Sequence, residues 1–155
     1  MKKVVLFPIL ITILSLHILV SCDDNESDTQ KPVINLIEPE EGAVLKPGSA
    51  IHFEMELSDN EMLRSYKVEI HDNFNNHGHE SKATKAETAP FTYNKSWDVS
   101  GLKNTHIHHH EIEIPANATE GAYHFMVYCT DAAGNELNVA RSIVLSKDGN
   151  DGTHE

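Results

Sequence analysis

The fold is decided by residues 121–145, which read GAYHFMVYCTDAAGNELNVARSIVL. From Tyr123 to Cys129 a bulky or apolar side chain recurs at every second position, which is the period of a β-strand with one buried face. The turn-forming segment DAAGN follows at 131–135. A second strand-like run extends from Leu137 to Leu145. The pattern therefore predicts a β-hairpin at the end of the domain.

The same strand period appears in the chain before this hairpin. Polar, turn-rich stretches separate the segments, and no helical period is sustained over a dozen residues. With the hairpin, this makes about seven strands and predicts an all-β antiparallel sandwich over residues 32–145, followed by a disordered tail at 146–155. The five further strand segments are Val33–Ile37, Ile51–Leu57, Tyr66–Ile70, Phe91–Trp97 and a strand that ends at Ile112–Ile114.

The N-terminus carries the features of an export signal. A short basic start precedes an apolar run from Val4 to Val20, which is typical of a signal peptide, although its length also approaches that of a transmembrane helix. The run ends in Leu19-Val20-Ser21-Cys22, which resembles the lipobox of bacterial lipoproteins. This resemblance implies that residues 1–21 are a signal peptide, removed before the mature protein is anchored in a lipid bilayer through acylated Cys22.

Residues 22–31 begin with Cys-Asp-Asp-Asn-Glu-Ser-Asp and are too polar to bury a surface, so we expect an acidic tether. The acidic stretch resembles the surface-export signal of lipoproteins from the Bacteroidota, which implies an outer-membrane protein exposed at the cell surface. The alternative is that this stretch is a solvated tether and carries no export signal. If Cys22 carries lipid, Cys129 has no disulfide partner and the domain depends on its hydrophobic core.

The composition restricts the classes of molecule that the protein can bind. The 155 residues include 12 Lys and Arg against 24 Asp and Glu, a formal net charge of -12. This charge argues against nucleic acid, which binds clustered cationic side chains. The length argues against a two-lobed enzyme. Cationic partners, including metal ions, remain open.

The histidines are the residues in this sequence that indicate a binding site, in particular one for a metal ion. Seven of the 11 lie between His71 and His110, and neutral imidazole is a good ligand for divalent transition metals. We expect Zn(II) ahead of Cu(II), with Ca(II) at turn aspartates as a weaker candidate. The spacing matches no stereotyped zinc motif and leaves open whether the ligands form one site or two. The candidate ligands are His71, His77 and His79 in and after the third predicted strand, and His106, His108 and His110 before Ile112.

The hairpin sequence supports a more specific resemblance. The segments GAYHFMV at 121–127 and DAAGN at 131–135 resemble the penultimate strand and last hairpin of bacterial immunoglobulin-like domains, with Tyr123 at the place of a tyrosine corner. From lipobox to DAAGN, the chain resembles a family of Bacteroidota lipoproteins of unknown function with a histidine-rich middle. The resemblance implies an immunoglobulin-like sandwich and no particular activity.

These observations leave two interpretations. In the first, the protein is an outer-membrane lipoprotein that captures or buffers zinc or copper, with an outer-membrane transporter or another envelope protein as its partner. In the second, it is an adhesion or carbohydrate-associated module with no metal role. We do not expect an enzyme, because no nucleophile with an adjacent base and no paired carboxylates are recognisable.

Overall fold

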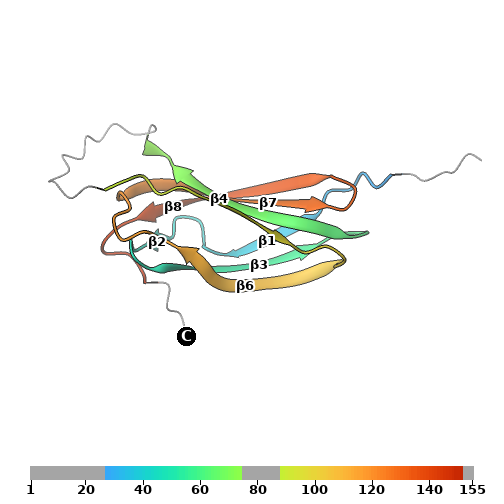
Figure 1. Ribbon diagram of the computed structural model, residues 1–155, viewed down its shortest axis with the longest axis horizontal. Coiled ribbons are helices and arrows are strands. Elements are labelled where there is room, and N and C mark those ends of the chain that lie inside the picture. Colours follow the sequence, from blue (N-terminus) through green and yellow to red (C-terminus); the bar gives the residue numbers. More distant parts are fainter. Residues whose placement is uncertain (1–26, 75–87, 152–155) are drawn as a thin grey trace, which may run out of the picture.

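The computed structural model describes residues 27–74 and 88–151, and all their regular elements are strands. Two sheets pack face to face, one with the order β1-β3-β6 and the other β2-β8-β7-β4-β5 (Figure 1). The described residues include no helix that is long and apolar enough to cross a membrane. The strands are β1 (Val33–Glu38), β2 (Val44–Leu45), β3 (Ala50–Ser58), β4 (Leu63–Asp72), β5 (Tyr93–Asp98), β6 (Asn104–Glu113), β7 (Gly121–Asp131) and β8 (Glu136–Leu145).

The topology is that of an immunoglobulin-like β-sandwich, as the sequence predicts. The chain crosses to the five-stranded sheet for β2 and returns for β3. It crosses again for β4 and β5, returns for β6 and crosses back for β7 and β8. All strand pairs are antiparallel except β2 with β8. Two details differ from the prediction: β2 is an additional strand of two residues, and the strand predicted to end at Ile112–Ile114 already begins at Asn104. The histidines from 106 to 110 therefore lie within a strand.

The core lies between the sheets and comes from the alternating apolar positions. The rings of Phe53 on β3 and Phe125 on β7 have centroids 5.8 Å apart, which joins the two layers. The tyrosine corner is confirmed: buried Tyr123 donates its hydroxyl to the Thr119 carbonyl at 2.7 Å and accepts the Phe91 amide at 3.2 Å. Among the fully buried side chains are Ile51, Phe53, Met55, Tyr123, Phe125, Val127 and Cys129.

Both ends of the described chain are attached to this body. Before β1, the Asp28 carbonyl accepts the side-chain amide of Asn135 at 3.0 Å. After β8, Asn150 exchanges backbone hydrogen bonds with β2 and the residue after it, at 2.9 and 3.0 Å. Residues 146–151 are thus held against β2, where the sequence predicts a disordered tail. The predicted signal peptide (1–21) and Cys22 lie outside the described residues.

Candidate metal centre

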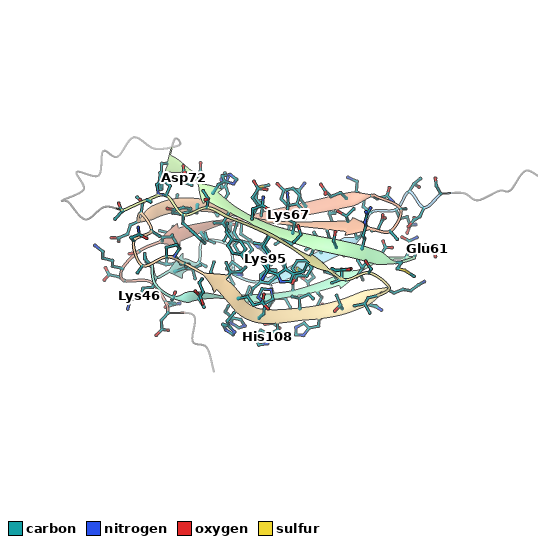
Figure 2. The ribbon with its side chains drawn as sticks, in the orientation of Figure 1. Lys46, Glu61, Lys67, Asp72, Lys95 and His108 are labelled. Atoms are coloured by element: carbon teal, nitrogen blue, oxygen red, sulfur yellow. The ribbon has the colours of Figure 1, made fainter. Side chains whose placement is uncertain are left out.

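The candidate centre lies on the outer face of the three-stranded sheet. His106, His108 and His110 share the exposed side of β6, whereas Ile107 and His109 on the same strand point toward the other sheet. Figure 2 shows His108 projecting away from the sandwich. The alternation along β6 is the one that an extended chain predicts.

Strand β3 adds a fourth histidine, His52, to this face, and a β-bulge in β6 lies opposite it. The register of β3 against β6 shifts by one residue at His52, so this residue alone lies opposite His110 and Glu111. The His52 ring lies 4.9 Å from the ring of His108 and 5.0 Å from that of His110, measured between centroids. Three imidazoles from two paired strands therefore converge.

The ring nitrogens of these residues are placed for metal binding. One nitrogen from each of His52, His108 and His110 can be chosen so that all three lie within 4.8 Å of one another. Tetrahedral zinc, with Zn–N distances of about 2.0–2.1 Å, holds its ligand nitrogens roughly 3.4 Å apart. Small rotations of the side chains would close the difference. The arrangement thus fits a site with three histidine ligands.

The environment of His52 adds to this fit. Its side chain is only 18% exposed, and both of its ring nitrogens are shielded from solvent without a hydrogen-bond partner. Unpaired buried polar atoms are unfavourable and uncommon. A bound metal ion would give one of these nitrogens a partner, because the nitrogen would become a ligand of the ion.

A carboxylate stands beside the three histidines. Glu54 Oε1 accepts a hydrogen bond from His106 Nε2 at 2.9 Å, and its Oε2 lies 3.9 Å from His52 Nε2. The hydrogen bond from His106 is the main reason that the pKa of Glu54 is lowered. Glu54 can therefore serve as a fourth ligand or as the acceptor that orients a ligand imidazole. His106 is not one of the three converging histidines, but its hydrogen bond to Glu54 links it to them.

His71, in contrast, lies on the other sheet. It projects from the outer side of β4, with its ring 5.3 Å from that of His124 and its Nδ1 4.0 Å from Glu69 Oε1. The outward-facing side chains of β4 and those of β6 lie on opposite sides of the sandwich, as Lys67 and His108 show in Figure 2. A single site that includes both His71 and the β6 histidines is therefore excluded. His77 and His79 lie outside the described residues.

His109 faces the interior and has a packing role. Its ring lies 5.0 Å from Phe53 and 5.2 Å from Trp97, and its Nε2 is 3.3 Å from the Tyr66 hydroxyl. Burial is the main cause of its lowered pKa. The inward position separates this histidine from the outward cluster.

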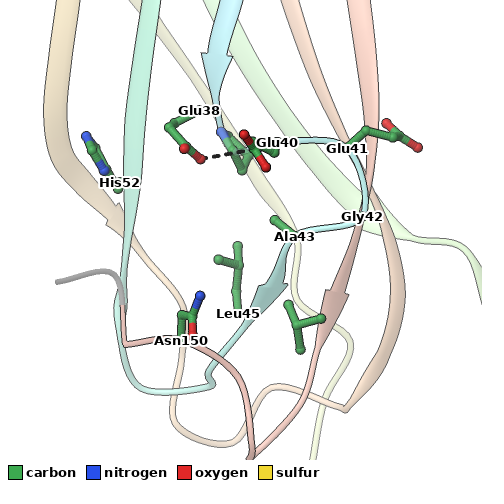
Figure 3. A pocket seen from close by; sticks show the side chains of 10 residues that line it. Glu38, Glu40, Glu41, Gly42, Ala43, Leu45, His52 and Asn150 are labelled. Carbon is green, nitrogen blue, oxygen red and sulfur yellow. Dashed lines mark hydrogen bonds between the residues drawn. The ribbon is translucent and has the colours of Figure 1, made fainter. Parts of the chain in front are cut away.

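A pocket of about 210 Å³ adjoins His52. Figure 3 shows it between β3 and the segment from Glu38 to Leu45, with Asn150 at its lower edge. Glu38, Glu40 and Glu41 line it, so the approach to His52 from this side is acidic. Such a lining attracts cations.

Comparison with known proteins places the chain in a family. A family model described as a domain of unknown function, DUF4625, matches residues 20–146. The chain belongs to this family. No curated protein matches it. Among solved structures, the fibronectin(III)-like modules of Clostridium thermocellum CbhA match with a TM-score of 0.35 and 12% identity, covering 74% of this chain and 97% of that chain.

In this DUF4625 domain, His52 is the site residue that the sequence alone does not reveal. It alternates outward on β3 between apolar residues, which by itself indicates a solvent-facing histidine. Its 58-residue separation from His110 (110-52) is bridged only by the pairing of β3 with β6. Strand order and the bulge would be needed to find it.

Proposed function

We propose that this protein is an outer-membrane lipoprotein, anchored through acylated Cys22, that binds a divalent transition metal at His52, His108 and His110. Zinc is the preferred ion and copper the second. The protein captures or buffers the metal at the bacterial envelope. The observation that carries the proposal is the convergence of three imidazole nitrogens within 4.8 Å on one sheet face.

The ligand set supports zinc. Neutral imidazole binds zinc well, and a site with three protein ligands leaves the fourth tetrahedral position to Glu54 or water. Two of the three ligands lie on one strand and the third on its hydrogen-bonded neighbour. A paired sheet holds such side chains at nearly fixed separations, so little ordering is needed when the ion binds.

The location supports capture and exchange. His108 and His110 are exposed, so an ion can enter and leave without opening the core. The acidic pocket beside His52 raises the local concentration of cations. A lipid anchor at Cys22, followed by the tether of residues 22–31, would hold the domain at the membrane, where a transporter or another envelope protein could receive the metal.

The proposal is tested by calorimetric titration of the full chain in detergent with ZnCl₂, using protein purified without a histidine tag. We expect one tight site per chain, weakened at least about tenfold by His52→Ala and by His108→Ala, because each removes a ligand. The matched control is His124→Ala, which removes a histidine on the outer side of the other sheet.

Equal affinity in the wild type, His52→Ala and His108→Ala would contradict this site. If the protein bound neither zinc nor copper at neutral pH, only the second interpretation would be left, in which the protein is an adhesion or carbohydrate-associated module.

A further inference from the structure

A second group of possible metal ligands lies at the end of the sandwich where the described chain begins. Asp28 precedes β1, Asp59 lies in the turn between β3 and β4, and Asp131 is the last residue of β7. One carboxylate oxygen from each can be chosen so that all three lie within 4.8 Å of one another. Residues that are far apart in the sequence thus form one acidic cluster.

The cluster is unusual because one of its residues is fully buried and the other two, which are half-buried, each have a shielded carboxylate oxygen. Asp131 is 0% exposed and is the one charged residue in the buried core of the described chain. The Oδ2 atoms of Asp28 and Asp59 are both shielded from solvent, and neither has a hydrogen-bond partner. A buried carboxylate oxygen without a donor is strongly disfavoured. Two such oxygens beside a third, fully buried carboxylate indicate a missing positive partner.

The protein itself does not supply that positive charge. Within residues 27–74 and 88–151, none of the three aspartates forms an ion pair with Lys, Arg or His. Lys103, which reaches this loop, directs its Nζ to the Asn60 carbonyl at 2.8 Å. Three negative charges at this separation repel one another, and a bound cation would offset this repulsion.

The other oxygens are held in place by the surrounding chain. Asp59 Oδ1 accepts the amides of Glu61 and Met62, at 3.0 and 2.8 Å. Asp28 Oδ1 accepts the Gln30 amide at 3.0 Å. In each of these two residues, one oxygen is therefore fixed by a backbone donor, and the second is without a hydrogen-bond partner and can bind an ion.

Asn135 connects the cluster to the β7–β8 turn. It donates its backbone amide and its side-chain amide to the two oxygens of Asp131, at 2.8 and 2.7 Å. The same side-chain nitrogen donates to the Asp28 carbonyl at 3.0 Å. The segment before β1 is thereby attached to the β7–β8 turn.

We propose that Asp28, Asp59 and Asp131 form a Ca²⁺ site. Ca²⁺ binds oxygen ligands only, accepts six to eight of them in irregular geometry, and is commonly held by carboxylates, backbone carbonyls and water. Mg²⁺ requires a nearly ideal octahedron and retains its water, which suits a buried cluster of carboxylates less well. Zinc prefers the nitrogen ligands of the histidine centre, so the two sites select different ions.

A bound ion would hold the first residues of the domain in place. Asp28 lies six residues after Cys22 (28-22), so Ca²⁺ would fasten the segment next to the anchor onto the β3–β4 and β7–β8 turns. This consequence rests on the proposed lipid anchor, whereas the Ca²⁺ site itself does not.

The test is thermal unfolding of the full chain in detergent, after chelator treatment, with CaCl₂ added up to about 10 mM, which spans the affinities of extracellular calcium modules. We expect Ca²⁺ to raise the melting temperature of the wild type by mass action. Asp28→Asn and Asp59→Asn should remove this rise, while the control Asp98→Asn retains it, because Asp98 lies outside the cluster and accepts its hydrogen bonds from Ser100.

A rise that persists in both cluster variants, or no rise in the wild type, would overturn the proposal. The variant His52→Ala distinguishes this proposal from the zinc centre, because it should retain the full response to CaCl₂. Asp131→Asn is a less suitable test, since a change at a fully buried position can prevent folding.

Discussion

At the scale of single residues, Tyr123 shows how one polar atom stabilises the sandwich. Its hydroxyl links the Thr119 carbonyl and the Phe91 amide within the core. Tyr123→Phe keeps the ring but leaves both backbone groups without this partner. We therefore expect a loss of about 1–3 kcal/mol in the free energy of unfolding, measured by urea denaturation.

The control for this experiment is Tyr128→Phe. The Tyr128 hydroxyl donates a weak hydrogen bond to the Met126 sulfur, at 3.6 Å, so its removal should change stability by less than about 0.5 kcal/mol. Equal losses in the two variants would show that the tyrosine corner has no special role.

At the scale of elements, the sequence predicts strands much better than the contacts between them. Alternation identifies β3 and β7 because each buries one face, but β2 has only two residues and leaves no periodic signal. The outward direction of His106, His108 and His110 also follows from alternation. The role of His52 does not, because it depends on a bulge between strands that are distant in sequence.

The segment after β8 allows a prediction about pH. The backbone amide of Lys147 donates to Glu120 at 3.0 Å and its ammonium lies 3.3 Å from the same carboxylate. These contacts, the backbone hydrogen bond first, lower the pKa of Glu120. Its contribution to stability is therefore present above the unfolded value of about 4.3 and is lost as the pH falls through the lower folded pKa.

We expect the wild type to lose more of its unfolding free energy than Glu120→Gln when the pH is lowered from about 5 to about 3. Urea midpoints at a series of pH values measure this difference. Glu113→Gln, at an exposed position on β6, is the control and should follow the wild type. If the curves of wild type and Glu120→Gln are parallel, the attachment of the C-terminal segment through Glu120 is not significant.

At the scale of the whole molecule, the proposed lipid anchor would determine where the histidine face can act. We expect Cys22→Ala to abolish incorporation of labelled fatty acid in a bacterial host and to leave a precursor of full length, because the acylated thiol is gone. Cys129→Ala, which changes the buried thiol, should be labelled like the wild type. Unchanged labelling of Cys22→Ala would reject the anchor.

The arrangement of the whole molecule also explains why the candidate site was only partly predictable from the sequence. Ligand density alone joins His71 with His106, His108 and His110 into one group. The order of the two sheets separates them, because β4 and β6 belong to different layers. Sheet order is set by packing across the whole core, which a local pattern does not contain.

The most direct test of the central claim is anomalous diffraction at the zinc edge, from crystals of the protein with one equivalent of zinc. We expect one strong peak at about 2.0–2.1 Å from a ring nitrogen of each of His52, His108 and His110. A strong peak bound only by other residues, with none at these three histidines, would contradict the account.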